Sequence, residues 1–395
     1  MALFSLLRLR LRLHRNFSTI LNPDSSTPLS SKAKSRAALS LLKTESNPQR
    51  IIDICKSASL SPVSHLDRIS FSVAISKLTG SKSFDFIRNF LEDLKSRPDL
   101  RNERFISHSI VLYGQAGMLD QAIQTFEKMH QVGVNPSVKS LNALLFSCIL
   151  AKKYDEVNRI FVDFSEKYSI TPNLDTYNTV IKAFCELGKS GSGFSILAGM
   201  DRKGVKPNAT SFGTLLAGFY NEEKYDDVGK VLKLMEEHGM RPGLSIYNIR
   251  IQSLCKLRKS SEAKALYEGM LSRGMKVNSV TYGHLIHGFA REGNLEQAKE
   301  LFRSMTKRGC KPDGPCYFTM LHFLCQSKDF ETALEICKEC TAKGWYPNFS
   351  TMKLLIEGLA SISKVDEARE LVGQVKEKFS GKADLWDEIE KSLPQ

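Results

Sequence analysis

A glycine that returns every 35 residues constrains this 395-residue chain more than any other feature. The evenly spaced copies are Gly204, Gly239, Gly274, Gly309 and Gly344, and Gly133 fits the same grid two repeats earlier with one residue inserted. A proline follows three residues later at Pro136, Pro207, Pro242, Pro312 and Pro347, and Pro172 holds that place in the copy without the glycine. A period of this length predicts a stacked-repeat solenoid, a class of fold that binds extended partners more often than it catalyses reactions.

Each repeat interval predicts two amphipathic helices. In 279–313 the run from Thr281 to Ile286 opens the first helix, Gly293 breaks it, and Leu295 to Lys307 forms the second. A methionine recurs at one position of the second helix, in Met129, Met200, Met235, Met270 and Met305. A small residue recurs at a second position of the same helix, in Ala122, Ala263, Ala298, Ala333 and Ala368. One hairpin is too thin to bury its own apolar stripe, so stability must come from neighbouring intervals.

The period divides the chain into units. We expect eight regular repeats, at 103–137, 138–173, 174–208, 209–243, 244–278, 279–313, 314–348 and 349–383. Two degenerate repeats occupy 32–102, with weaker copies at 33–67 and 68–102. Residues 384–395 are expected to form a C-terminal helix that caps the last repeat, because Leu385, Trp386, Ile389 and Leu393 recur at helical spacing.

Several fragments carry a family resemblance. The segments 174–185 (LDTYNTVIKAFC) and 280–289 (VTYGHLIHGF) resemble the first helix of a pentatricopeptide repeat, and 203–208 (KGVKPN) resembles its closing turn. The period of 35 separates the chain from tetratricopeptide repeats, whose period is 34. Units of one length class resemble the P-type subfamily, whose members are typically organellar RNA-binding factors, often in plants. The resemblance implies an all-α, right-handed superhelical solenoid of about ten 35-residue helix-turn-helix repeats.

The resemblance also implies a code in which each repeat reads one RNA base through its fifth and last residues. The readable pairs are Ser72 with Asn102, Ser107 with Ser137, Asn142 with Asn173, Asn178 with Asn208, and Asn248 with Asn278. Other intervals offer only their last residue, Asp313 or Asn348, opposite Gly283 or Phe318. An amide presents both a donor and an acceptor to a base edge. By the family's rules the pairs predict A-?-Y-Y-?-Y-?-? from 5′ to 3′.

The second position of each repeat departs from the family pattern. Members usually carry an apolar residue there, which sandwiches the base, and Ile69 and Val280 fit this pattern. The others are polar or charged: Arg104, Lys139, Asp175, Thr210, Ser245 and Ser350. A stacked base contributes about 1–3 kcal/mol, so losing these platforms weakens sequence-specific reading. The pattern favours a protein held on RNA by many shape and charge contacts.

The first residues resemble a targeting segment. Residues 7–13 (LRLRLRL) alternate leucine with arginine, and the first 22 residues contain no acid. A basic amphipathic segment followed by serine-rich chain is typical of a transit peptide, and the resemblance favours mitochondrion over plastid, with cleavage after Phe17. We therefore expect residues 1–31 to be a transit peptide and linker. The alternative is a basic tail that binds RNA itself. The formal charge of +13 belongs to the whole chain and favours a phosphate-rich partner.

No catalytic or metal site is predicted, and no cofactor. The pair Cys337-x-x-Cys340 has ligand spacing, but both positions are core positions in other intervals and no second such pair exists. His284 and His287 share one first helix and are expected to be groove or packing residues. The chain contains no His-x-Glu deaminase motif. We interpret it as non-enzymatic, with no small-molecule substrate.

Three functions remain open. The first is a mitochondrial matrix factor that binds single-stranded RNA, either mRNA or rRNA, without any membrane. The second is a component of the mitochondrial ribosome in contact with ribosomal proteins, its base reading vestigial. The third is a protein–protein scaffold, which would leave the repeated asparagine pairs unexplained.

Overall fold

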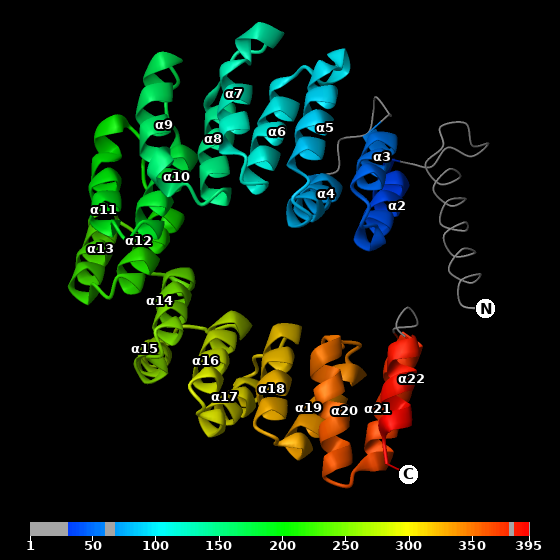
Figure 1. The fold of residues 1–395 in the computed structure, drawn as a ribbon. Coiled ribbons are helices and arrows are strands. Elements are labelled where there is room, and N and C mark those ends of the chain that lie inside the picture. The colour runs from blue at the N-terminus through cyan, green and yellow to red at the C-terminus, as the bar shows by residue number, and fades with distance from the viewer. Residues whose placement is uncertain (1–30, 60–67, 379–382, 395) are drawn as a thin grey trace, which may run out of the picture. The chain divides into compact units, whose positions relative to one another are not determined.

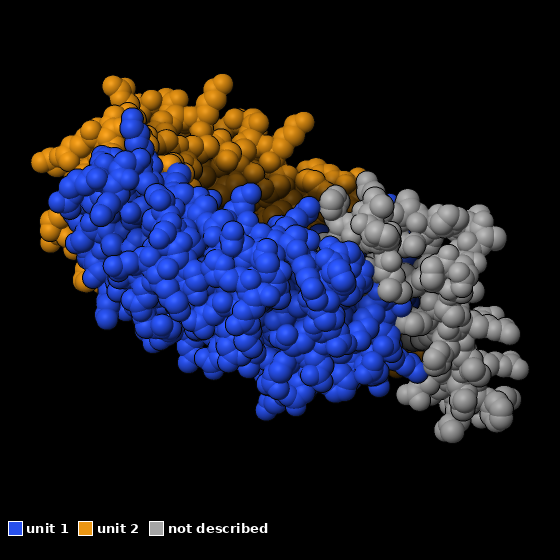
Figure 2. Space-filling model, turned by 90° about the horizontal axis from the view of Figure 1, so that it is seen from above, with its two compact units in different colours: residues 1–207 blue, residues 208–395 orange. Residues whose placement is uncertain are grey.

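The computed structural model describes residues 31–59, 68–378 and 383–394, and every regular element in these ranges is a helix (Figure 1). The chain divides into two compact units at Pro207, coloured separately in Figure 2. Unit 1 contains α2 (Ser31–Thr44), α3 (Pro48–Ser59), α4 (Arg68–Gly80), α5 (Phe84–Ser96), η1 (Pro98–Leu100), α6 (Glu103–Gln115), α7 (Leu119–Glu127), η2 (His130–Val132), α8 (Val138–Leu150), α9 (Tyr154–Lys167), α10 (Leu174–Glu186), α11 (Ser190–Gly199) and η3 (Asp201–Lys203).

Unit 2 continues the same alternation of first and second helices. It contains α12 (Ala209–Asn221), α13 (Tyr225–Glu237), α14 (Leu244–Lys256), α15 (Ser260–Ser272), α16 (Ser279–Arg291), α17 (Leu295–Lys307), α18 (Gly314–Gln326), α19 (Phe330–Ala342), α20 (Phe349–Ser361), α21 (Val365–Lys378) and α22 (Ala383–Ser392). From α6 to α20, each first helix begins at the first residue of a predicted interval and is 13 residues long.

The turn between the two helices of a repeat contains one residue in the left-handed conformation. Glycine takes this place at Gly117, Gly188 and Gly293, as expected for a residue without a Cβ atom. Other repeats place a side chain there, in Lys82, Lys152, Glu223, Arg258, Lys328 and Ser363. The turn geometry is therefore shared by all these repeats, whether or not the sequence supplies the glycine that would favour it.

The turn that closes a repeat uses the periodic glycine. Gly204, Gly239 and Gly309 have φ values of 73°, 71° and 77°, which end the second helix in the left-handed conformation. In the 36-residue interval that lacks the glycine, Ser169 takes the same conformation with φ of 51°. The chain thus keeps the closing turn where the sequence signal for it is missing.

The predicted core positions are buried. All five alanines of the recurrent small position have no exposed surface, and the five methionines are at most 3% exposed. Cys337 and Cys340 are also core residues with no exposed surface, and burial raises their pKa values to about 12 and about 11. Both thiols therefore stay protonated at neutral pH. Among the described residues, no three His, Cys, Asp or Glu side chains are placed to share a metal ion.

The C-terminal helix α22 lies on the last helical pair. Trp386 is 1% exposed, and its ring centroid lies 4.6 Å from that of Phe349 on α20. Lys376 on α21 forms ion pairs with Asp387 and Glu390. Leu385, which was expected on the buried face, is 44% exposed, because it lies at the edge of the helical stripe whose buried members are Trp386, Ile389 and Leu393.

The predicted targeting segment, including Phe17, lies outside the described residues. Within the described ranges, every helix is too short or too polar to cross a lipid bilayer.

Candidate nucleic-acid interface

In the intervals from 68–102 to 314–348, the last residue is the N-cap of the next first helix. Side-chain oxygens of these residues accept hydrogen bonds from backbone N–H groups in the first helical turn, at 2.9–3.1 Å, in Asn102, Ser137, Asn173, Asn208, Asn278, Asp313 and Asn348. Gly243 is the exception and makes no side-chain cap. Because the first turn of a helix has unpaired N–H groups, Asn, Asp and Ser are preferred at this place. The predicted reading residues therefore also start the helices.

A hydrogen-bond network joins Asn142 on α8 to Asn173 before α10. The Nδ2 of Asn142 donates to Oδ1 of Asn173 at 3.1 Å, and the hydroxyl of Thr176 donates to Oδ1 of Asn142 at 2.6 Å. The backbone N of Asn173 donates to the same hydroxyl oxygen at 3.1 Å. A threonine hydroxyl has one proton to donate, so this network fixes the orientation of the Asn142 amide. Among the described residues, a second Nδ2 proton of Asn142 and the Nδ2 group of Asn173 are left for an outside acceptor.

The same arrangement recurs in unit 2 with Asn248, Asn278 and Thr281. The Nδ2 of Asn248 donates to Oδ1 of Asn278 at 3.4 Å, and the hydroxyl of Thr281 donates to Oδ1 of Asn248 at 2.7 Å. Asn278 caps α16 by accepting from the backbone N of Thr281 at 3.1 Å. Asn248 is 9% exposed, so the network presents a restricted and oriented edge of its amide. Two predicted pairs are thus held together in the same geometry.

The first two predicted pairs are arranged differently. The hydroxyl of Ser72 donates to Oε1 of Gln115 at 2.9 Å, while Asn102 caps α6. Ser137 caps α8 and donates its hydroxyl to Glu103. The hydroxyl oxygen of Ser107 is buried and has no hydrogen-bond partner within the described residues. In these two pairs, therefore, the side chains of the fifth and last residues are not joined in one hydrogen-bond network.

The remaining predicted residues lie at equivalent places. Asn178 is half-buried on α10 in unit 1, and Asn208 caps α12 in unit 2. Partial burial acts to raise the pKa of Asp313, but hydrogen bonds to Cys316 and Ser279 outweigh it and hold that pKa below its ordinary value. The carboxylate that caps α18 is therefore ionised at neutral pH.

The second residue of each first helix is exposed. Ile69 is 62% exposed and Val280 is 46% exposed, so both can meet a ligand as apolar platforms. Arg104, Lys139 and Asp175 are exposed at the same place in their own repeats. The polar and charged residues that replace the apolar ones at this position are thus on the surface. A ligand there would meet a polar or charged side chain and no apolar platform.

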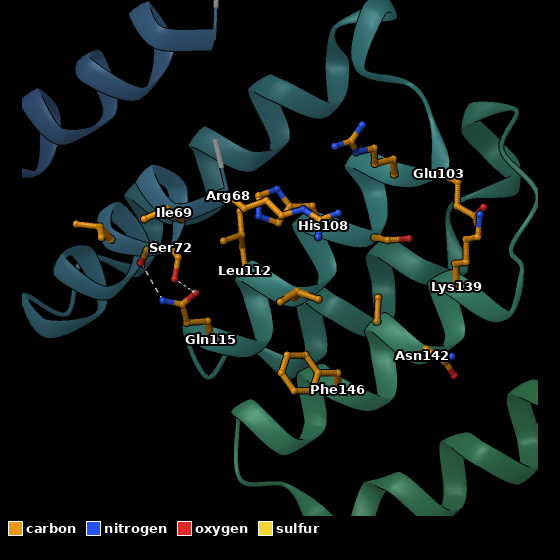
Figure 3. A pocket seen from close by; sticks show the side chains of 15 residues that line it. Arg68, Ile69, Ser72, Glu103, His108, Leu112, Gln115, Lys139, Asn142 and Phe146 are labelled. Carbon is orange, nitrogen blue, oxygen red and sulfur yellow. Dashed lines mark hydrogen bonds between the residues drawn. The ribbon is translucent and has the colours of Figure 1, made fainter. Parts of the chain in front are cut away.

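A groove crosses the first helices of three consecutive repeats in unit 1 (Figure 3). This α4–α8 groove has a volume of about 960 Å³. Its walls include Arg68, Arg104, Lys139 and Asn142, and Phe146 lies in it with 43% of its surface exposed. The groove is continuous with the amide network because Asn142 belongs to both.

Sequence reasoning missed the threonine hydroxyls that orient the amides. A signal was present in the spacing Asn-x-x-Thr at Asn173 and Thr176 and again at Asn278 and Thr281. An N-cap residue followed three residues later by a polar side chain is the spacing of a capping box, and the structure forms that box at both places.

Family models match most of the regular repeats. A model described as the PPR repeat family matches residues 172–221, 242–291 and 277–326. A pentatricopeptide repeat domain model matches 107–148 and 140–186, and a PPR repeat model matches 210–240.

Curated relatives match as well. The chain is 53% identical over 384 residues to a mitochondrial pentatricopeptide repeat-containing protein of Arabidopsis thaliana, covering 97% of this chain and 94% of that protein. It is 33% identical over 203 residues to a protein of the small ribosomal subunit of Arabidopsis thaliana, covering 50% of this chain and 49% of that protein. The crystal structure of the maize pentatricopeptide repeat protein PPR10 aligns with a TM-score of 0.42 at 16% identity, covering 89% of this chain and 60% of that chain.

Proposed function

Because this chain belongs to the pentatricopeptide repeat family, we propose that it binds single-stranded RNA in the mitochondrion, through the amide pairs at the starts of its first helices. The observation that carries the proposal is the network of Asn142, Asn173 and Thr176, repeated by Asn248, Asn278 and Thr281. Both networks orient an amide and leave donors for a base edge. The mitochondrial location is supported by the relative of 53% identity and by the basic N-terminal segment.

The chain acts by binding and not by catalysis. Asp313 at the interface serves as the cap of α18. His287 packs its ring against that of Phe323 at 5.8 Å, and burial is the main cause that lowers its pKa. These roles favour a scaffold that holds RNA in place.

Binding of short oligonucleotides to the purified protein tests the proposal. RNAs with pyrimidines at the third, fourth and sixth positions should bind more tightly than RNAs with purines there. Asn142→Ala should weaken binding about fivefold, the equivalent of about 1 kcal/mol for one hydrogen bond. Asn158→Ala is the matched control, since Asn158 is exposed on the second helix α9. Equal affinity for scrambled RNA and no effect of Asn142→Ala would refute base reading by these pairs.

A second candidate is a component of the mitochondrial ribosome. It is favoured by the relatives named as small ribosomal subunit proteins, at 33% and 31% identity over about half of each chain. Sedimentation of the native protein from a mitochondrial lysate, with and without magnesium chelation, separates the two candidates. A ribosomal component travels with a ribosomal subunit after chelation. A separate RNA-binding factor stays near the top of the gradient, or moves there after RNase treatment.

A further inference from the structure

A second pocket in unit 1 lies at the C-terminal ends of the second helices α5 and α7. This α5–α7 pocket has a volume of about 240 Å³. Among the described residues that line it, Ile106 alone belongs to a first helix, and the others lie on α5, on α7 or in the turns that follow these helices. None of them lines the α4–α8 groove or belongs to a predicted reading pair. The pocket is therefore separate from the candidate nucleic-acid interface.

The α5–α7 pocket has an excess of positive charge. Lys95, Arg101 and Lys128 line it, and Glu92 is the one carboxylate in the described lining. Glu92 is already engaged, because its Oε1 accepts hydrogen bonds from Nζ of Lys95 at 2.7 Å and from the hydroxyl of Tyr113 at 3.1 Å. Within the described residues, neither Arg101 nor Lys128 has a carboxylate partner. An anion in the pocket would therefore meet two cations that no ion pair occupies.

Several hydrogen-bond donors of the pocket are also left for a ligand. Arg101 donates from Nη2 to the carbonyl oxygen of Ser96 at 3.1 Å, which uses one of the five N–H groups of a guanidinium. Lys95 donates to Glu92 and, at 3.1 Å, to Oγ1 of Thr125, which uses two of the three protons of an ammonium. Thr125 is only 5% exposed, and its own hydroxyl proton has no acceptor among the described residues. A buried donor without an acceptor favours a site that an oxygen of a ligand completes.

The same small volume has apolar walls. Ile106 is 4% exposed and Val132 is 39% exposed, and both line the pocket. Its volume of about 240 Å³ is below the range of about 300–1,000 Å³ that is usual for small-molecule sites, so it has room for about one amino-acid residue. A ligand that fits must therefore carry its negative charge and its apolar group close together.

A carboxylate suits the pocket better than a phosphate. The C-terminal ends of α5 and α7 have partial negative charge, and Glu92 adds a full negative charge. These charges oppose a phosphate group, which carries up to two charges, more strongly than a carboxylate, which carries one. In an apolar residue at the end of a chain, the carboxylate and the side chain leave the same Cα atom. Such a residue brings both groups into one small pocket.

We infer that the α5–α7 pocket binds the C-terminal carboxylate of a partner protein whose last residue is apolar. Arg101 and Lys128 pair with the carboxylate, the hydroxyl of Thr125 donates to one of its oxygens, and Ile106 and Val132 contact the apolar side chain. Capture of a chain end through its carboxylate is one of the recurring modes of peptide recognition. This site goes beyond RNA binding and does not depend on it, since the pocket and the reading pairs share no residue.

Fluorescence anisotropy of a labelled pentapeptide, Gly-Gly-Gly-Ala-Leu, tests the inference on the full chain. The peptide with a free C-terminal carboxylate should bind about tenfold or more tightly than the same peptide with a C-terminal amide, because the amide has no charge. Arg101→Gln with Lys128→Gln should weaken binding of the peptide acid about tenfold and leave binding of the amide unchanged. Val132→Ser should weaken binding of both peptides about threefold, because it removes an apolar wall.

The matched control is Arg202→Gln with Lys203→Gln. It removes one arginine and one lysine, both exposed, from the turn η3 in the same unit, and it should keep the affinity of the wild type. Thermal melts check that every variant folds. Equal affinities of the wild type for acid and amide would overturn the inference, as would an unchanged affinity for the acid in Arg101→Gln with Lys128→Gln.

Two further measurements separate the carboxylate from other anions. Displacement of the labelled peptide acid by inorganic phosphate at a lower concentration than by unlabelled peptide acid would overturn the inference and assign the pocket to phosphate. The pocket variants should keep the affinity of the wild type for a pyrimidine-containing RNA. A loss of RNA affinity without a loss of peptide binding would likewise overturn the inference, whereas failure of the wild type to bind RNA would affect the proposed function alone.

Discussion

The close contact between the first helices α6 and α8 predicts that Gly114→Ala destabilises the fold. Gly114 is buried on α6, where the backbone of α8 approaches it. A Cβ atom added there would lie 2.3 Å from Cβ and 2.4 Å from Cα of Ser147. Carbon atoms in contact lie about 3.5–4.0 Å apart, so α6 and α8 would have to separate by about 1 Å or more. Neither obstructing atom is the end of a flexible side chain that could rotate away.

Two effects of opposite sign decide how much Gly114→Ala changes the free energy of unfolding. Replacing glycine by alanine inside a helix stabilises the helix by about 1 kcal/mol, because the unfolded chain loses freedom. Overpacking a close contact costs about 1–3 kcal/mol, and here the obstruction includes backbone. We expect net destabilisation of about 1–2 kcal/mol. The matched control is Gly229→Ala on α13, where an added Cβ meets no atom within 4 Å. It should stabilise α13 by up to about 1 kcal/mol.

Amide hydrogen exchange measures both effects locally, which suits a repeat protein whose parts open separately. Exchange in α6 and α8 should become faster in Gly114→Ala, and exchange in α13 should become slower in Gly229→Ala. Slower exchange in α6 and α8 of Gly114→Ala would refute the reasoning, because the helix preference would then outweigh the contact.

Four further predictions concern two fifth residues of first helices, one helix cap and one closing turn. Asn248→Ala should weaken binding of a pyrimidine-containing RNA about fivefold in fluorescence anisotropy, and an unchanged affinity would contradict its proposed role. Gly283→Asn should create a base preference opposite Asp313, since an added Cβ finds its nearest atom at an ordinary 3.6 Å; RNAs that differ at that base test it. The carboxylate of Asp313 has a lowered pKa, so its contribution to stability is present above about pH 4 and is lost as the pH falls through the lowered value. Asp313→Asn, which can still cap α18, should therefore show a smaller loss of melting temperature between pH 7 and pH 3 than the wild type. Ser169→Gly should stabilise its turn by about 1 kcal/mol, because a left-handed residue other than glycine is strained; unchanged exchange in α9 would argue against that strain.

Features that repeat with the period could be predicted from the sequence. The segment Leu295–Lys307 was expected as a second helix, and α17 has these bounds. Ala298 and Met305 were expected in its core, and neither has exposed surface. These predictions succeed because they depend on local helix preference and on an apolar stripe, both of which are properties of consecutive residues.

Features that depend on a neighbouring repeat were not predictable in the same way. The hydroxyl of Thr176 reaches Asn142 across 34 residues, and its role depends on how two first helices are aligned. Lys152 and Arg258 adopt the left-handed conformation although neither is a glycine, so the sequence did not indicate it. The packing of the two helices of the repeat imposes this turn. Whether the predicted pairs read bases stays a prediction, since reading requires a ligand.

The capping role of the last residue has a consequence for how such a chain can change its target. A substitution at Asn173 or Asn278 can destabilise the fold as well as change RNA binding, since only a few side chains cap the start of a helix well. The fifth residue lies inside a helix and does not have to cap one. Variation in specificity should therefore accumulate at the fifth residue, while the last residue is confined to residues that start a helix well, which from Asn102 to Asn348 are asparagine, aspartate, serine and, at Gly243, glycine.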